Sequence, residues 1–131
     1  MPTQQIDLEK LTKLGGGAKV ERQLEVFPNH SPGLTVRAEC KEFTCFCPLT
    51  HQPDFAEIII TYTPKDWVVE SKSLKLYLES FREVGVFHEH LAVDIAQDFI
   101  DFAAPHWVKV EVKFNARGGI AISAECVKEN E

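Results

Sequence analysis

Residues 70–77 read Glu-Ser-Lys-Ser-Leu-Lys-Leu-Tyr and bring hydroxyl and ammonium groups to the start of an amphipathic stretch. The first backbone N–H groups of a helix and the positive end of its dipole favour a bound anion. Lys72 and Lys75 add charge on neighbouring turns, beside Ser71 and Ser73. The segment therefore predicts a helix start suited to phosphate, although such a sequence is more often a solvated charged face.

A thiol and a carboxylic acid lie upstream, in residues 47–55, which read Cys-Pro-Leu-Thr-His-Gln-Pro-Asp-Phe. Cys47 precedes a proline in an expected loop, where a thiolate would be reachable as a nucleophile. The alternative for Cys47 is a small buried residue. Asp54 precedes an apolar run, and partial burial there would raise its pKa towards that of a useful acid. The alternative for Asp54 is a turn-forming acid, and Cys45 is interpreted as a core residue.

A second amphipathic stretch begins with His88 and Glu89. A glutamate in a first helical turn is ordinary, since it complements the helix dipole. A metal-binding set could in principle form from four residues, Cys47, His51, His88 and His90. Because positions 88 and 90 do not share a helical face and no CxxC pair occurs, we expect no metal.

Composition limits the class of protein. The chain has 131 residues, of which 44% are hydrophobic and 26% charged, as in a soluble globular domain with one core. No apolar run could span a membrane and no signal peptide is visible, so we expect a single cytoplasmic domain with no membrane partner. The net charge of -6 argues against direct nucleic-acid binding. The four cysteines are expected to be thiols.

Hydrophobic periodicity predicts the element order β-β-α-α-β-β. The expected strands cover residues 34–46, 55–63 (resuming at 67–69), 108–114 and 120–127. The first expected helix starts at an N-cap of Ser71 or Ser73 and stops by Gly85. The second has Leu91, Ile95, Phe99 and Phe102 on one face and ends at Pro105.

Two hairpins around a helical pair predict an α+β fold, with a mainly antiparallel sheet and helices on one face. The exposed edge strands of such a sheet favour pairing between subunits, so we expect a homo-oligomer. Residues 1–33 contain a run of three glycines at 15–17 and are expected to be irregular.

Taken together, these segments resemble the QueF family, the NADPH-dependent 7-cyano-7-deazaguanine reductases of queuosine biosynthesis. The family signature Glu-(Ser/Leu)-Lys-(Ser/Ala)-hydrophobic-Lys-(Leu/Tyr)-aromatic is complete at residues 70–77. The segment Cys-Pro-x-Thr-x-Gln-Pro-Asp-Phe is complete at residues 47–55. Three further segments follow in order, Ser-Phe-Arg at 80–82, Phe-His-Glu at 87–89 and Arg-Gly-Gly at 117–119.

The resemblance implies the tunnelling fold, in which β-β-α-α-β-β units join into oligomeric barrels with sites between subunits. It also implies reduction of the nitrile of 7-cyano-7-deazaguanine to 7-aminomethyl-7-deazaguanine, with two NADPH consumed, in a pathway of tRNA modification. Cys47 would add to the nitrile to form a covalent thioimide. Asp54 would protonate the nitrile nitrogen, and His88 would assist proton transfer.

The remaining site residues are also implied by their motifs. Glu89 would bind the guanine-like edge of the substrate, together with Glu70 and Ser71. The residues that would hold NADPH are Ser71, Lys72, Ser73, Lys75, Arg117 and Gly118. The family reductases need no metal, which agrees with the absent ligand spacing.

Two departures from the family pattern stand out. His51 replaces a residue that is often glycine, and residues 90–91 replace a second cysteine that protects the nucleophile in some members. Cys45 is a candidate substitute for that cysteine, with a strained span. Two alternative functions stay open: another tunnelling-fold enzyme that acts on a pterin or purine, and a non-catalytic module that binds a deazapurine.

Overall fold

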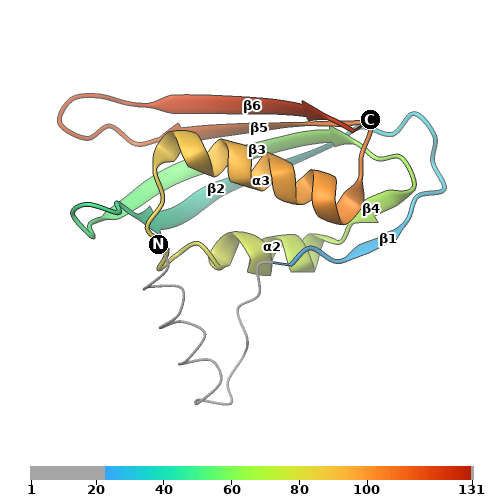
Figure 1. Cartoon of the computed structure of the whole chain (residues 1–131), viewed down its shortest axis with the longest axis horizontal. Helices are drawn as coiled ribbons and strands as arrows, with labels where there is room; N and C mark the ends of the chain where they lie inside the picture. Colours follow the sequence, from blue (N-terminus) through green and yellow to red (C-terminus); the bar gives the residue numbers. More distant parts are fainter. Residues whose placement is uncertain (1–22, 131) are drawn as a thin grey trace, which may run out of the picture.

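The computed structural model describes residues 23–130 and contains a four-stranded sheet with two helices on one face (Figure 1). In chain order the elements are β1 (Val26–Pro28), β2 (Val36–Phe46), β3 (Pro53–Thr63), β4 (Trp67–Val69), α2 (Ser71–Glu79), α3 (His88–Ala103), β5 (Trp107–Phe114) and β6 (Ser123–Glu129). The main sheet and its helices follow the predicted β-β-α-α-β-β order, which confirms the α+β fold. The glycine run at residues 15–17 lies outside the described residues.

The main sheet is antiparallel throughout, with its strands in the order β2-β3-β5-β6. Successive side chains of a strand point to opposite faces, so every second residue faces the helices. In β5 the buried positions run from Val108 to Phe114, as the alternation predicts. In β3 the even-numbered residues from Asp54 to Tyr62 are buried on this face. Asp54 therefore ends a row that is otherwise mostly apolar.

A bulge interrupts β2 between Cys40 and Phe43, where its pairing with β3 shifts. An extra residue in one strand reverses which later side chains face the core. Cys40 is opposite Ile58 before the bulge, and Phe43 is opposite Ala56 after it. The reversal turns Cys45 inwards, where its side chain is fully buried. The expected core position of Cys45 is thus confirmed.

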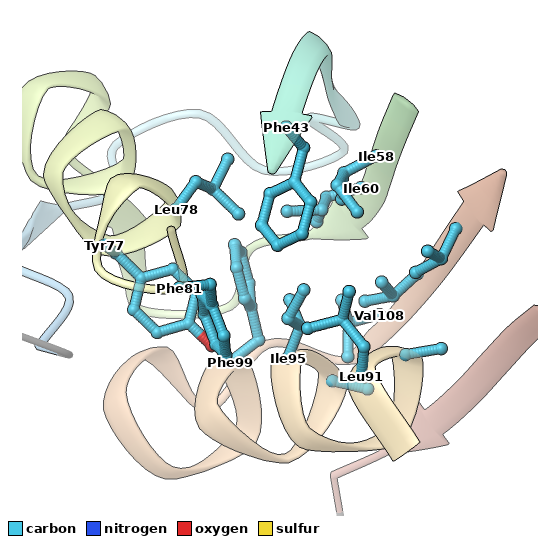
Figure 2. Packing of buried hydrophobic residues seen from close by; sticks show 14 of the residues in the cluster. Phe43, Ile58, Ile60, Tyr77, Leu78, Phe81, Leu91, Ile95, Phe99 and Val108 are labelled. Atoms are coloured by element: carbon cyan, nitrogen blue, oxygen red, sulfur yellow. The ribbon is translucent and has the colours of Figure 1, made fainter. Parts of the chain in front are cut away.

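The core lies between the sheet and both helices, and its largest side chains are aromatic (Figure 2). Phe81 contacts Phe43 of β2 and Tyr77 of α2, with ring centroids 5.8 and 5.4 Å apart. Tyr62 of β3 meets Phe99 of α3 edge-on at 5.1 Å. Tilted and edge-on pairs at such distances add to the free energy of burial. These contacts hold each helix on the sheet.

The apolar face of α3 differs from the predicted face at one position. The buried row consists of Leu91, Ile95, Phe99 and Ala103. Because this row advances by four residues, Phe102 falls beside it and is 37% exposed. The assignment of Phe102 to the buried face was therefore wrong.

The N-cap of α2 is Glu70, and not Ser71 or Ser73 as the sequence suggested. The Glu70 carboxylate accepts hydrogen bonds from the backbone N–H groups of Lys72 and Ser73, both at 2.8 Å. The Ser73 hydroxyl is used elsewhere, since it donates to the Glu70 carbonyl at 2.8 Å and accepts from the N–H of Glu25 at 3.0 Å. Serine thus fastens α2 to the segment before β1, and glutamate caps the helix.

The strand β1 corrects the expectation that residues 1–33 are irregular. It pairs antiparallel with β4 in a separate two-stranded sheet, and Leu24 just before it is buried in the core. A three-residue strand that ends in proline has too few positions to show a period of two. Only its contacts in the folded chain define it.

The last strand begins three residues later than expected, at Ser123 instead of Ile120. Ser123 pairs with Lys113, and the residues between β5 and β6 form the connecting turn. Ile120 in this turn is 65% exposed. Its apolar side chain suggested a strand, but the register of the hairpin sets the true start.

Three segments that are distant in sequence meet at one end of the sheet. Figure 1 shows the β2–β3 connection, the β5–β6 connection and the first turn of α3 together at the left of the view. Helix α2 starts beside β4 at the other end and runs back towards them. The residues that could do thiol chemistry lie at this left-hand end.

Candidate active site

The loop that follows β2 carries Cys47 and is closed by backbone hydrogen bonds. The Cys47 N–H donates to the Gln52 carbonyl, and the His51 N–H donates to the Cys47 carbonyl, both at 2.9 Å. His51 has φ of 59°, in the left-handed region that glycine adopts most easily. A glycine would adopt this backbone shape without strain, and in this chain His51 adopts it.

The Cys47 thiol is half-buried and lies just beyond the last residue of β2. The Thr50 hydroxyl, followed by the backbone N–H groups of Thr50 and Leu49, lowers the pKa of Cys47 by stabilising the thiolate. The charge of Asp54 acts in the opposite direction and is a smaller effect. The lowered pKa favours the thiolate, which is the nucleophilic form of the group.

Cys45 has the opposite character. Burial, followed by the negative charge of Asp54, raises the pKa of Cys45 to about 12. The group therefore stays a protonated thiol under ordinary conditions. Each of the four cysteines, at positions 40, 45, 47 and 126, is a free thiol.

The contribution of Thr50 can be tested by substitution. We expect Thr50→Val to move the midpoint of Cys47 alkylation to higher pH, because the main hydrogen bond to the thiolate is lost. Thr50→Ser keeps the hydroxyl and should keep the wild-type midpoint. The measurement is the rate of iodoacetamide labelling of the Cys47 peptide as a function of pH. A range of about pH 5 to 10 covers ordinary thiol titration. Equal midpoints for the valine and serine variants would contradict the assignment.

Asp54 lies between two cationic or potentially cationic side chains. Its Oδ2 is 3.2 Å from Nε2 of His88, and its Oδ1 is 3.3 Å from Nε of Arg117. The Asp54 side chain is buried, as expected at the end of the inward-facing row of β3. A buried carboxylate is tolerated when both oxygens have such partners.

His88 is held against the sheet by a ring contact. Its imidazole stacks on Phe114 of β5, with centroids 3.5 Å apart and planes 6° apart. Together with the contact to Asp54, the stacking fixes the plane of the imidazole. An acid and an imidazole in hydrogen-bond reach form a unit that can hold or move a proton.

Arg117 contacts three successive residues of the other hairpin. Nη1 donates to the side-chain oxygen of Gln52 at 2.9 Å, Nη2 donates to the Pro53 carbonyl at 2.6 Å, and Nε faces Asp54. The turn beside it contains Gly118 and Gly119, with φ of 59° and 81°. The structure thus brings Arg117 together with Asp54 and His88.

The expected phosphate site at the start of α2 has a different chemistry from the one predicted. Two of the N–H groups that would meet an anion already donate to Glu70, and these bonds lower the pKa of its carboxyl group. Ser73 is buried and bonded to Glu25. Ser71, Lys72 and Lys75 are exposed on the helix surface. The lysine ammonium groups, and not the backbone N–H groups at the helix start, are therefore available to bind an anion.

A hollow of about 1020 Å³ lies between α2 and the bulged part of β2. Its lining includes Ser71, Lys75 and Arg82 from the α2 region, and Phe43, Phe55 and Asn115 from the sheet. Its size suits a large ligand. Its lining carries both charges, with three cationic side chains (Lys41, Lys75 and Arg82) and four glutamates (Glu39, Glu42, Glu57 and Glu79). Lys72, Ser73 and Arg117 do not line it.

Glu89 lies in the first turn of α3, next to His88, and its side chain is exposed. The structure therefore brings Cys47, Asp54, His88, Glu89 and Arg117 to one end of the sheet. It does not bring the start of α2 to the same place, since α2 begins beside β4 at the other end of the sheet (Figure 1).

Three residues at this end received no individual role from the sequence. Thr50 and Gln52 belong to the 47–55 motif, which was the available signal for them. Phe114 was expected only as a core residue of its strand, and nothing in the sequence pairs it with His88.

Among residues 23–130 no group of three or more histidine, cysteine or acidic residues could hold a metal ion. No helix within that range is long and apolar enough to cross a membrane.

The fold and this site define an α+β protein of the tunnelling type, with a thiol near a buried acid that contacts an imidazole. The chain belongs to the QueF-like family, whose model matches residues 53–131 under the description "QueF-like protein". Two relatives are named NADPH-dependent 7-cyano-7-deazaguanine reductase. The one from Frankia casuarinae is 52% identical over 92% of this chain and 98% of its own. The one from Syntrophus aciditrophicus is 50% identical over 91% of this chain and 86% of its own.

A solved structure has the same fold. It is described as the archaeosine synthase QueF-Like in the apo form, and it superposes with a TM-score of 0.68 at 28% sequence identity. The match covers 74% of this chain and 94% of that one. The likeness supports the antiparallel sheet and the helical pair seen in Figure 1.

Proposed function

We propose that this chain catalyses the NADPH-dependent reduction of the nitrile of 7-cyano-7-deazaguanine to 7-aminomethyl-7-deazaguanine. The observation that carries the proposal is the Cys47 thiol, with its lowered pKa, at the same end of the sheet as the buried Asp54 and its partner His88. The reductase names of relatives at 50 to 52% identity support the same activity. The enzyme would then act in the cytoplasm, in queuosine biosynthesis for tRNA modification, without itself binding nucleic acid or a membrane.

The first step is addition of the Cys47 thiolate to the nitrile carbon. One S–C bond forms, one of the three C–N bonds breaks, and the nitrogen takes one proton, so the product is a thioimide. The step involves no oxidation or reduction. Asp54 and His88 are the proposed source of the proton that the nitrogen takes. They contact one another at the same end of the sheet as Cys47, and such a pair can pass a proton.

Glu89 is the proposed recognition residue for the guanine-like base. A carboxylate can accept paired N–H bonds from such an edge. It follows His88 directly in the first turn of α3, so it is on the rim of the same end. Glu70 is a weaker candidate for this role, because its carboxylate caps α2.

We expect Glu89→Gln to weaken substrate binding by about 10- to 100-fold, the scale of one lost charged hydrogen bond. The amide replaces one acceptor by a donor and removes the charge. Calorimetric titration with the cyano substrate gives the affinity, and iodoacetamide labelling should find the Cys47 thiol as reactive as before. Glu83→Gln is a matched control, since Glu83 is an exposed glutamate in the turn before α3. Unchanged affinity in the Glu89 variant would leave Glu89 only a helix-start role.

The residues available to hold NADPH are cationic and exposed. Lys72 and Lys75 on α2 would meet its phosphates, with Ser71 beside them, and the hollow next to α2 has room for a dinucleotide. When bound, NADPH supplies the hydride equivalents for two successive reductions. Because the lysines are solvent-exposed, apparent NADPH affinity should fall as salt rises.

The proposed active site is shared between subunits of a homo-oligomer. Asp54 and Thr63 are at opposite ends of β3, about 30 Å apart at about 3.3 Å per residue. Helix α2 starts just after β4, beyond the Thr63 end, and is only about 13 Å long at 1.5 Å per residue. A second copy could bring its α2 lysines to the Cys47 end. The edge strands β2 and β6 are the natural surfaces for such an assembly.

The direct test of the activity is the loss of NADPH absorbance when the cyano substrate is added. We expect two NADPH to be consumed for each amine formed, because nitrile to amine is a four-electron reduction. A hydrolytic enzyme of the same fold would release ammonia without NADPH loss. A binding module would do neither, and either of these results would overturn the proposal.

A further inference from the structure

We propose that Arg117 is a positioning residue that fixes the Asp54 carboxyl group and the Cys47 loop, and not a ligand of the NADPH phosphates. The inference rests on the proposed nitrile reduction. It reassigns one residue of the Arg-Gly-Gly segment from cofactor binding to the chemistry at the thiol.

The guanidinium of Arg117 reaches three consecutive residues with three different nitrogens. Its partners are the Gln52 side chain at 2.9 Å, the Pro53 carbonyl at 2.6 Å and the Asp54 carboxylate at 3.3 Å. Such a planar fork is rigid, so three contacts fix the group in both position and orientation. A guanidinium used in this way has few donors left for a phosphate.

Through its contact with Gln52, Arg117 also helps to fix the position of the Cys47 nucleophile. The backbone carbonyl of Gln52 accepts from the Cys47 N–H at 2.9 Å, while its side chain accepts from Arg117. Arg117 and Cys47 are therefore linked through one residue. On the other side, Arg117 and His88 approach the two different oxygens of Asp54, so the carboxyl plane is fixed between them.

The glycines after Arg117 have a conformational reason that needs no ligand. The backbone N–H and carbonyl of Arg117 both bond to Ile120, at 2.9 and 3.1 Å, across a two-residue turn. Positive φ at both Gly118 and Gly119 is typical of the tight turn that joins twisted strands. A Cβ at either glycine would meet nothing within 4 Å, so backbone conformation and not space selects glycine. The turn thus holds the base of the Arg117 side chain.

The test separates thioimide formation from NADPH use. Thioimide formation is followed by its near-ultraviolet band after the cyano substrate is added without NADPH. The KM for NADPH is measured separately in full turnover. For Arg117→Gln we expect thioimide formation to slow about 100-fold, the scale of a small misplacement of reacting groups. We expect the KM for NADPH to stay within about twofold of wild type, since in this account no phosphate contact is lost.

Two further variants keep the test decisive. Arg117→Lys keeps the charge but not the fork, so it should restore only part of the rate. Gln52→Leu removes the hydrogen bond between the Gln52 side chain and Arg117 while the arginine itself is unchanged. This variant should also slow thioimide formation. Gln52→Leu decides the matter if the Arg117 variants do not fold, as judged by circular dichroism.

A wild-type rate of thioimide formation in Arg117→Gln, together with a raised KM for NADPH, would return Arg117 to phosphate binding. A wild-type rate in Gln52→Leu would likewise overturn the positioning role. If the wild-type protein itself gives neither the band nor NADPH loss, the proposed function fails and the role of Arg117 fails with it. The two failures are therefore distinguishable.

Discussion

Cys47→Ala is expected to reduce turnover by about 10⁴-fold or more, the scale on which loss of a covalent nucleophile acts. The reason is that no neighbouring group can replace the thiol. Cys45 is buried and its raised pKa keeps it protonated. NADPH consumption with the cyano substrate is the measurement. Folding should be preserved, because the Cys47 side chain lies beyond β2 and only half-buried.

Cys45→Ala is the matched control for this substitution. It removes a thiol two residues away, from the inward-facing side of β2, and should remain active. If the alanine at position 45 abolished turnover and the alanine at position 47 did not, the assignment of the nucleophile would be reversed.

Asp54→Asn is expected to lower turnover by about 10²- to 10⁴-fold, the usual contribution of a positioned acid or base. The amide keeps the shape and can still accept from Arg117, but it cannot hold or deliver a proton to the nitrile nitrogen. The Arg117 side chain is 41% exposed, so water can solvate its charge in the variant. We therefore expect the fold to persist, which thermal unfolding would check.

Asp94→Asn is a suitable control for the loss of charge. Asp94 is an exposed aspartate on α3, and its replacement should leave turnover near the wild-type value. Equal turnover in the Asp54 and Asp94 variants would remove Asp54 from the chemistry. It would leave Asp54 as a buried turn acid, the alternative that the sequence also allowed.

Much of the fold could be predicted because its elements carry strong local patterns. The alternation in β5 and the apolar run of β3 each identify a strand without knowledge of neighbours. The features that sequence reasoning missed depend on contacts between distant segments. Strand β1 exists because it pairs with β4, and the N-cap of α2 moves to Glu70 because Ser73 is bonded to Glu25. No local pattern contains that information.

In the candidate site, too, the sequence predicts the chemical groups but not the contacts between distant segments. The motifs identified Cys47, Asp54 and His88 as chemical groups, and the hairpin register then explains why Cys45 is opposite Asp54. The phosphate site at the start of α2 was predicted from free N–H groups, but Glu70 binds two of them. The three contacts of Arg117 join residues of two hairpins that are far apart in sequence, and only the folded register brings them together.

The most direct test of the covalent bond at Cys47 is mass spectrometry of the protein after the cyano substrate is added without NADPH. We expect a mass increase equal to the whole substrate, since addition to a nitrile expels nothing. Peptide mapping should find the increase on Cys47 alone, and later addition of NADPH should remove it. An unmodified protein, or an adduct on a different cysteine, would contradict the proposed thioimide at Cys47.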